Sequence, residues 1–161
     1  TPHLTANMFM TMTGTRMVHV PYRGETLVLN DMLGGHVDLF FGNVSAALAL
    51  WRDGKVKVLA VLDKKRSAQM PDVPTTAEAG MPGLVAVGWF AAAGPPKMAP
   101  ALRDQIARDF IEVLKMPDVQ AKYRALSVEP GGQTPAETAA FIKEEARIWG
   151  DVIKKNNIVV D

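Results

Sequence analysis

The chain of 161 residues contains no cysteine, which excludes disulfide bonds and thiolate chemistry. Charge of one sign is not in excess either, because 18 lysines and arginines against 17 acidic residues give a net charge of +1. This balance gives no electrostatic reason to expect binding to nucleic acid or to an anionic membrane. No apolar run approaches the roughly 20 residues of a membrane-spanning helix, so we expect no direct membrane insertion. The hydrophobic content of 48% is enough for one core.

Side chains that would mark an enzyme or a metal site are also scarce. The serines are Ser45, Ser67 and Ser127, and the histidines are His3, His19 and His36. No serine lies in a G-x-S-x-G sequence, and the histidines are too far apart for an HxxxH pair on one helix. The glycine pairs lack the spacing of nucleotide-binding loops. We therefore predict no catalytic residue, no metal and no cofactor.

Residues 18–43 have the pattern of one parallel βαβ unit. Residues 17–20 form a short β-branched run, and the Pro-Tyr-Arg-Gly tetrad at 21–24 predicts a turn. Residues 25–33 then favour a helix that ends at Gly34-Gly35, and 37–41 read as a strand buried on both faces. The turns that follow such strands lie at one edge of the sheet, where open α/β sheets bind ligands.

The rest of the chain continues this alternation and then changes character. We expect a helix over residues 43–53, a strand over 56–62, an irregular passage over 63–83 and a strand over 84–93. Thr75 and Glu78 have capping-box spacing within the irregular passage. Residues 100–115 predict an amphipathic helix with an apolar stripe at Leu102, Ile106, Phe110 and Leu114, followed by helices at 118–126 and after Thr134.

Several motifs in this order resemble one known family. They are VHVPYRG, DMLGGHVD, GKVKVLAV, RSAQMPDVPTTAEAGMPG and WFAAAGPP. The chain resembles the substrate-binding proteins of tripartite tricarboxylate transporters, also called the Bug family, from Thr1 to about Ile158. The sequence Ala-Ala-Ala-Gly-Pro-Pro at 91–96 departs from the A-P-A-G-T-P that is usual in the family. This departure affects only the expected shape of one loop.

The resemblance implies an incomplete two-lobed α/β fold of the periplasmic-binding-protein type II kind. Residues 1–85 would form a ligand-binding lobe without its opening strand, and 86–161 the crossover strand and C-terminal helical part of the other lobe. Family members are about twice this length, so we expect the missing strand and a signal peptide upstream of Thr1. The resemblance also implies a periplasmic monomer that closes on a small carboxylate, such as a di- or tricarboxylate, and delivers it to membrane transporter subunits.

Helix starts are the first candidate ligand sites, because their free backbone N–H groups and positive dipole ends attract carboxylates. The resemblance favours the start at Thr1 and His3 and the turn at Gly42, Asn43 and Ser45. Every helix has such an end, so without the resemblance neither would stand out.

Tyr22, Arg23 and Trp89 complete the predicted ligand-binding residues. A phenol and a guanidinium after a strand can donate hydrogen bonds to a carboxylate. The alternatives are a solvated turn residue for Arg23, which is the more common role, and a packing role for the ring of Tyr22. Trp89 can equally form a wall of the cleft or lie in a core.

Two other functions remain open from the sequence. A cytoplasmic ligand-sensing domain of a transcription regulator can share the two-lobed architecture, and a helix-turn-helix segment before Thr1 would identify it. An enzyme acting on a carboxylate would need a catalytic constellation that the residues do not provide.

Overall fold

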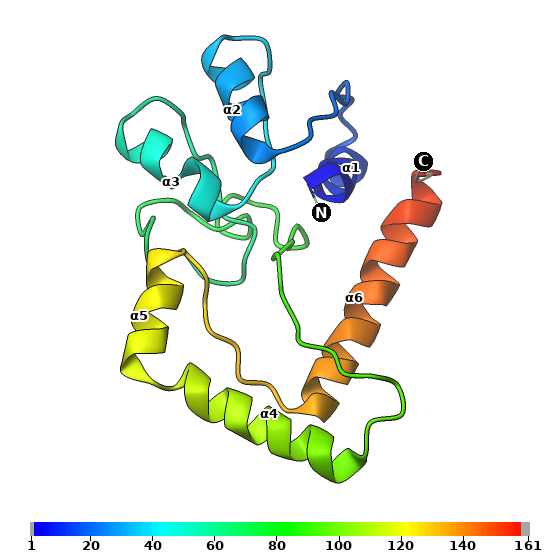
Figure 1. Cartoon of the computed structure of the whole chain (residues 1–161). Coiled ribbons are helices and arrows are strands. Elements are labelled where there is room, and N and C mark those ends of the chain that lie inside the picture. Colours follow the sequence, from blue (N-terminus) through cyan, green and yellow to red (C-terminus); the bar gives the residue numbers. More distant parts are fainter. Residues whose placement is uncertain (1, 159–161) are drawn as a thin grey trace. The chain divides into compact units, whose positions relative to one another are not determined.

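The computed structural model describes residues 2–158, and within them the regular structure consists of six α-helices (Figure 1). The helices are α1 (Pro2–Thr13), α2 (Glu25–Leu33), α3 (Val44–Arg52), α4 (Pro100–Leu114), α5 (Pro117–Ala125) and α6 (Pro135–Lys155). The chain divides into two compact units, the first ending at Gly88 and the second beginning at Trp89. Contacts between helices join α2 to α3 in the first unit, and α4 to both α5 and α6 in the second. The assignment of residues 1–85 and 86–161 to two lobes stays a prediction.

Local sequence signals explain where the helices begin and end. Proline is the first residue of α4, α5 and α6, a position where its missing N–H costs no hydrogen bond. The start of α6 is the predicted capping box: Glu137 N–H donates to the Thr134 hydroxyl, and the Glu137 carboxylate accepts from Thr134 N–H at 2.8 Å. Helix α2 ends at the predicted glycine pair, and Gly35 has a φ of +74° that favours glycine.

The predicted strands are the main difference between expectation and structure. Residues 17–20, 37–41 and 84–93 form no strand within residues 2–158. In 56–62 Val61 forms an isolated parallel bridge with Thr75, and Leu62 O accepts a hydrogen bond from Ala86 N–H at 2.9 Å. Val61 N–H donates to Pro74 O at 2.9 Å, and Thr76 N–H donates to Val61 O at 3.0 Å. The prediction of sheet ladders in these segments is therefore wrong. The physical reason is that an apolar extended segment becomes a strand only where a neighbouring segment supplies the ladder hydrogen bonds.

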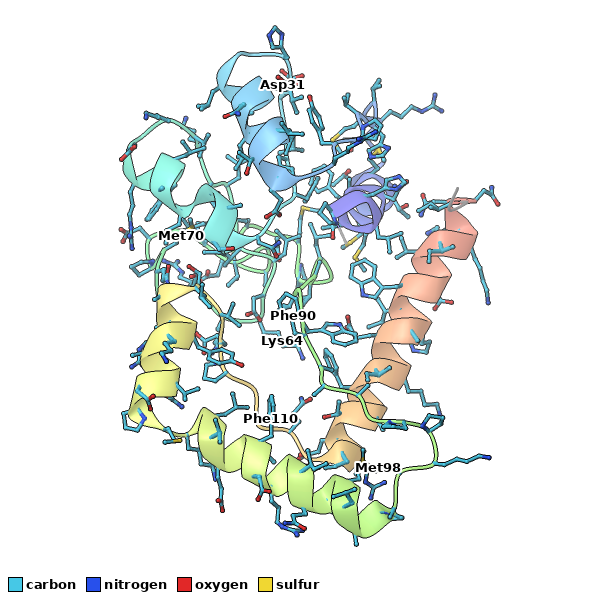
Figure 2. All side chains as sticks on the ribbon, in the orientation of Figure 1. Asp31, Lys64, Met70, Phe90, Met98 and Phe110 are labelled. Atoms are coloured by element: carbon cyan, nitrogen blue, oxygen red, sulfur yellow. The ribbon has the colours of Figure 1, made fainter. Side chains whose placement is uncertain are left out.

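The best-buried part of the first unit is the passage predicted to be irregular. Met70 is fully buried, and it packs with Val61 and Val73 in a cluster that α3 covers with Val44, Leu48 and Trp51. Figure 2 shows Met70 beside α3. A proline- and glycine-rich segment thus folds back on itself and supplies the core of this unit.

Polar contacts hold this fold-back in place. Thr75 and Glu78 form the expected reciprocal pair, with Thr75 N–H donating to the Glu78 carboxylate at 2.7 Å and Glu78 N–H to the Thr75 hydroxyl at 3.1 Å. The Arg66 guanidinium donates to the same carboxylate at 2.9 Å. The buried Thr76 hydroxyl donates to Leu84 O at 2.6 Å, which closes the segment.

The apolar stripe of α4 is less buried than its spacing predicts. Leu114 is buried, whereas Leu102, Ile106 and Phe110 are each about half exposed, at 50%, 46% and 51%. The amphipathic helix is present, but only its last stripe residue is enclosed by the described residues.

Met70→Ala should destabilise the first unit by about 2–5 kcal/mol, because it leaves a cavity where a fully buried side chain was. The measurement is urea unfolding followed by far-UV circular dichroism. Met116→Ala is the matched control, since Met116 is 49% exposed, and it should change the free energy by less than about 0.5 kcal/mol. Equal losses for the two variants would contradict the assignment of Met70 to the core.

The Glu78 carboxylate should make stability depend on pH. The Arg66 hydrogen bond, followed by the one from Thr75 N–H, lowers the pKa of Glu78 from 4.5 to about 2. A lowered pKa in the folded protein stabilises it above the unfolded value, and this contribution is lost as the pH falls from 4.5 through about 2.

We expect the thermal midpoint of the native chain to fall more steeply over this acid range than that of Glu78→Gln. Glu112→Gln, at an exposed position on α4, should follow the native curve. Parallel curves for Glu78→Gln and the native chain would refute the linkage.

Candidate functional site

Two of the predicted ligand-binding turns lie together in the first unit, held by Glu25. This residue begins α2, directly after the turn at 21–24. Its Oε1 atom accepts hydrogen bonds from the backbone N–H of Asn43 at 2.9 Å and from Asn43 Nδ2 at 3.0 Å. This direct contact confirms the prediction that the turns at 21–24 and 42–45 lie near each other.

Asn43 occupies the N-cap position of α3, but its side chain does not cap the helix. Its amide group donates to Glu25 instead. Within residues 2–158, no acceptor contacts the backbone N–H of Val44 or Ser45. The exposed start of α3 thus retains two N–H groups and the Ser45 hydroxyl as donors.

Two glycines allow the chain to approach closely at this turn. A Cβ atom on Gly42 would collide with the ring of Phe40, so the ring position requires glycine there. A Cβ atom on Gly88 would lie 3.2 Å from Asn43 Oδ1, so the segment at the end of the first unit also passes beside Asn43. Gly42 consequently shapes the turn and offers only its backbone to a ligand.

Tyr22 and Arg23 differ in how their side chains are engaged. The Tyr22 hydroxyl donates to Asp31 Oδ2 on α2 at 2.6 Å, and this hydrogen bond raises the pKa of Tyr22. Asp31 is labelled on α2 in Figure 2. The Tyr22 phenol is therefore partly committed to fixing its own turn. Arg23 is exposed, and no carboxylate among residues 2–158 pairs with its guanidinium.

His3 and His19 form a stacked pair, with ring centroids 4.0 Å apart and an interplanar angle of 5°. Partial burial, and then the proximity of His19, lower the pKa of His3, which favours the neutral ring. The stack joins the start of α1 to the extended segment before Pro21. Thr1, the other predicted ligand residue of this helix start, lies outside the described residues.

Trp89 belongs to the second unit, and its described contacts lie within that unit. Its indole N–H donates to Glu145 Oε2 at 3.1 Å, and Trp149 donates to the same oxygen at 2.9 Å. The ring of Trp89 also meets Phe141 edge to face, with centroids 5.5 Å apart. Trp89 thus packs against α6.

The sequence analysis missed Glu25, Asp31 and Glu145, the three carboxylates that organise these residues. Only Glu25 carried a local signal, since an acidic residue in the first turn of a helix interacts favourably with its dipole. The other two act through contacts that spacing alone does not reveal.

Within residues 2–158, no helix is long and apolar enough to cross a membrane. The same residues contain no group of three or more histidine, aspartate or glutamate side chains arranged to hold a metal ion.

Glu145→Ala should shift two of the three indole N–H signals in a ¹⁵N-correlated NMR spectrum, because Trp89 and Trp149 lose their shared acceptor. The Trp51 signal, from the first unit, should stay. Glu144→Ala is the matched control, since Glu144 pairs with Arg147 and touches neither indole. A shift of one indole signal alone would contradict the shared carboxylate.

Comparison with known proteins places the chain in a family. The sequence matches the tripartite tricarboxylate transporter family receptor, TctC, over residues 1–158. BugT of Bordetella pertussis is 34% identical over 153 residues, which cover 95% of this chain and 47% of BugT.

Solved structures agree with this match. The structure of R. palustris Rpa4515 with adipate has a TM-score of 0.83 and 31% identity, and the structure of the periplasmic binding protein BugD has 0.79 and 27%. Each comparison covers 98% of this chain and 53% of the other.

The chain spans about half the length of BugT and of both solved relatives. These neighbours confirm the predicted fold class, an incomplete two-lobed α/β fold of periplasmic solute-binding proteins. Family members are solute-binding receptors and not enzymes, as the sequence predicted. The chain belongs to the tripartite tricarboxylate transporter receptor family.

Proposed function

We propose that this chain carries one wall of a binding site for a small carboxylate, and that the protein delivers this solute to a tripartite tricarboxylate-type transporter in the periplasm. The observation that carries the proposal is the pair of hydrogen bonds from Asn43 to Glu25, which hold together the turns at 21–25 and 42–45. The adipate in the R. palustris relative supports a dicarboxylate-sized ligand for a chain of 31% identity.

The donors at these turns suit a carboxylate. The exposed Arg23 guanidinium can bind two carboxylate oxygens in a fork, and Val44 N–H, Ser45 N–H and the Ser45 hydroxyl are available at the start of α3. Both α2 and α3 begin at these turns, so the positive ends of two helix dipoles add to the attraction. Four donors of this kind can replace the water that a carboxylate loses on binding.

The other predicted ligand residues take supporting roles in this proposal. Tyr22 holds the first turn through Asp31 and keeps its phenol oxygen as an acceptor. Gly42 shapes the second turn. Thr1, His3 and Trp89 remain proposed ligand contacts on the rest of the site. We also propose that the protein works as a monomer and meets the membrane only through its transporter subunits.

Titration of the ¹⁵N-labelled chain with adipate tests the proposal, since NMR detects binding even at millimolar affinity. We expect amide shifts concentrated at residues 21–25 and 42–46. Arg23→Gln should weaken binding about tenfold, because it removes one charge-assisted interaction.

Arg52→Gln is the matched control, since Arg52 lies at the opposite end of α3 and should bind adipate as the native chain does. Shifts confined to the second unit, for example in the 350 Å³ groove lined by Arg103, Arg108 and Pro135, would contradict the proposed site. Absence of any shift at saturating adipate would count against an adipate-like ligand for this wall.

A further inference from the structure

The carboxylate of Glu25 lies at the junction of the two proposed ligand-binding turns, and the proposed function gives it no part in recognition. Both of its described hydrogen bonds go to one oxygen, Oε1. No donor among residues 2–158 contacts Oε2. Glu25 therefore presents a fixed negative charge with one unused acceptor at the site.

Asn43 adds a second acceptor at the same point. Its amide group is oriented by Glu25, because Nδ2 donates to that carboxylate. The Oδ1 atom consequently turns toward Gly88, where a Cβ atom would lie 3.2 Å away. No donor in the described part of the chain contacts Oδ1. The junction of the turns thus offers two acceptor oxygens, and the donors of Arg23 and of the start of α3 are close to Glu25 and Asn43 along the chain.

We infer that Glu25 is a specificity-determining residue that selects a hydroxylated carboxylate over its unsubstituted analogue, by accepting a hydrogen bond from the ligand hydroxyl. This inference rests on the proposed function. The ligand carboxylate binds the donors of Arg23 and Ser45, and the neighbouring hydroxyl donates to Glu25 Oε2. A second carboxylate at this point meets a like charge and no donor, so it is disfavoured.

The contact between α2 and α3 makes this selection specific. Glu25 is held by two hydrogen bonds at the start of α2. A positioned acceptor discriminates by leaving its own lone pairs unsatisfied when the ligand lacks the matching donor. A carboxylate on a mobile side chain would hydrogen-bond to water when the ligand lacks a hydroxyl, and the discrimination would be lost.

Malate and succinate test the inference, because they differ by one hydroxyl group. Calorimetric or NMR titration of the native chain should give about tenfold tighter binding of malate. In Glu25→Gln the Oε1 atom can still accept from Asn43, but the second polar atom becomes a donor and the charge is lost. The preference should therefore fall to twofold or less, mainly because the malate hydroxyl loses its charged acceptor. Glu112→Gln, a remote exposed glutamate, should keep the native preference.

Each outcome bears on the inference, and the native chain alone can overturn it. Equal affinities of the native chain for malate and succinate would overturn the role of Glu25 while leaving the proposed function intact, since both ligands bind. An unchanged tenfold preference in Glu25→Gln would assign the selection to another group. No binding of malate, succinate or adipate to the native chain would overturn the proposed function and this inference together.

Discussion

The burial of Met70 against Val61 and Val73 is the constraint on which the rest of the first unit depends. This cluster packs against α3 through Leu48 and Trp51, and so fixes where that helix begins. The position of Asn43 at the start of α3 then determines where Glu25, and with it α2, is held. A hydrophobic contact in a loop-like segment thus sets the geometry of an exposed polar turn.

Helices were predictable from the sequence because their signals are local. Proline at first helical positions, the Thr134–Glu137 capping box and the glycine pair after Leu33 each act within one turn of chain. Strands were not predictable in this way. An apolar run such as residues 37–41 indicates only a preference for extended backbone, and strand pairing depends on a partner elsewhere in the chain. The core around Met70 was missed for a related reason: prolines and glycines indicate turns, but they do not reveal what the turns enclose.

The closeness of the two candidate turns was predictable from the sequence, whereas the side-chain contacts around them were not. The turns were recognisable from their position before two expected helices, and they do lie together although the segments that precede them form no strand. The partners that restrain the named residues are other side chains: Asp31 for Tyr22, His19 for His3 and Glu145 for Trp89. Each lies 9 to 56 positions away along the chain, beyond the reach of any motif.

The position of Glu25 and Asn43 outside the hydrophobic cluster has an evolutionary consequence. Substitutions at exposed turn residues leave the packing around Met70 intact, so selection can change the recognised solute without first compensating a loss of folding stability. The proposed recognition residues and the hydrophobic cluster are thus different residues of the same unit. Such separation allows one receptor scaffold to diversify, by single replacements, into a set of proteins with different nutritional roles.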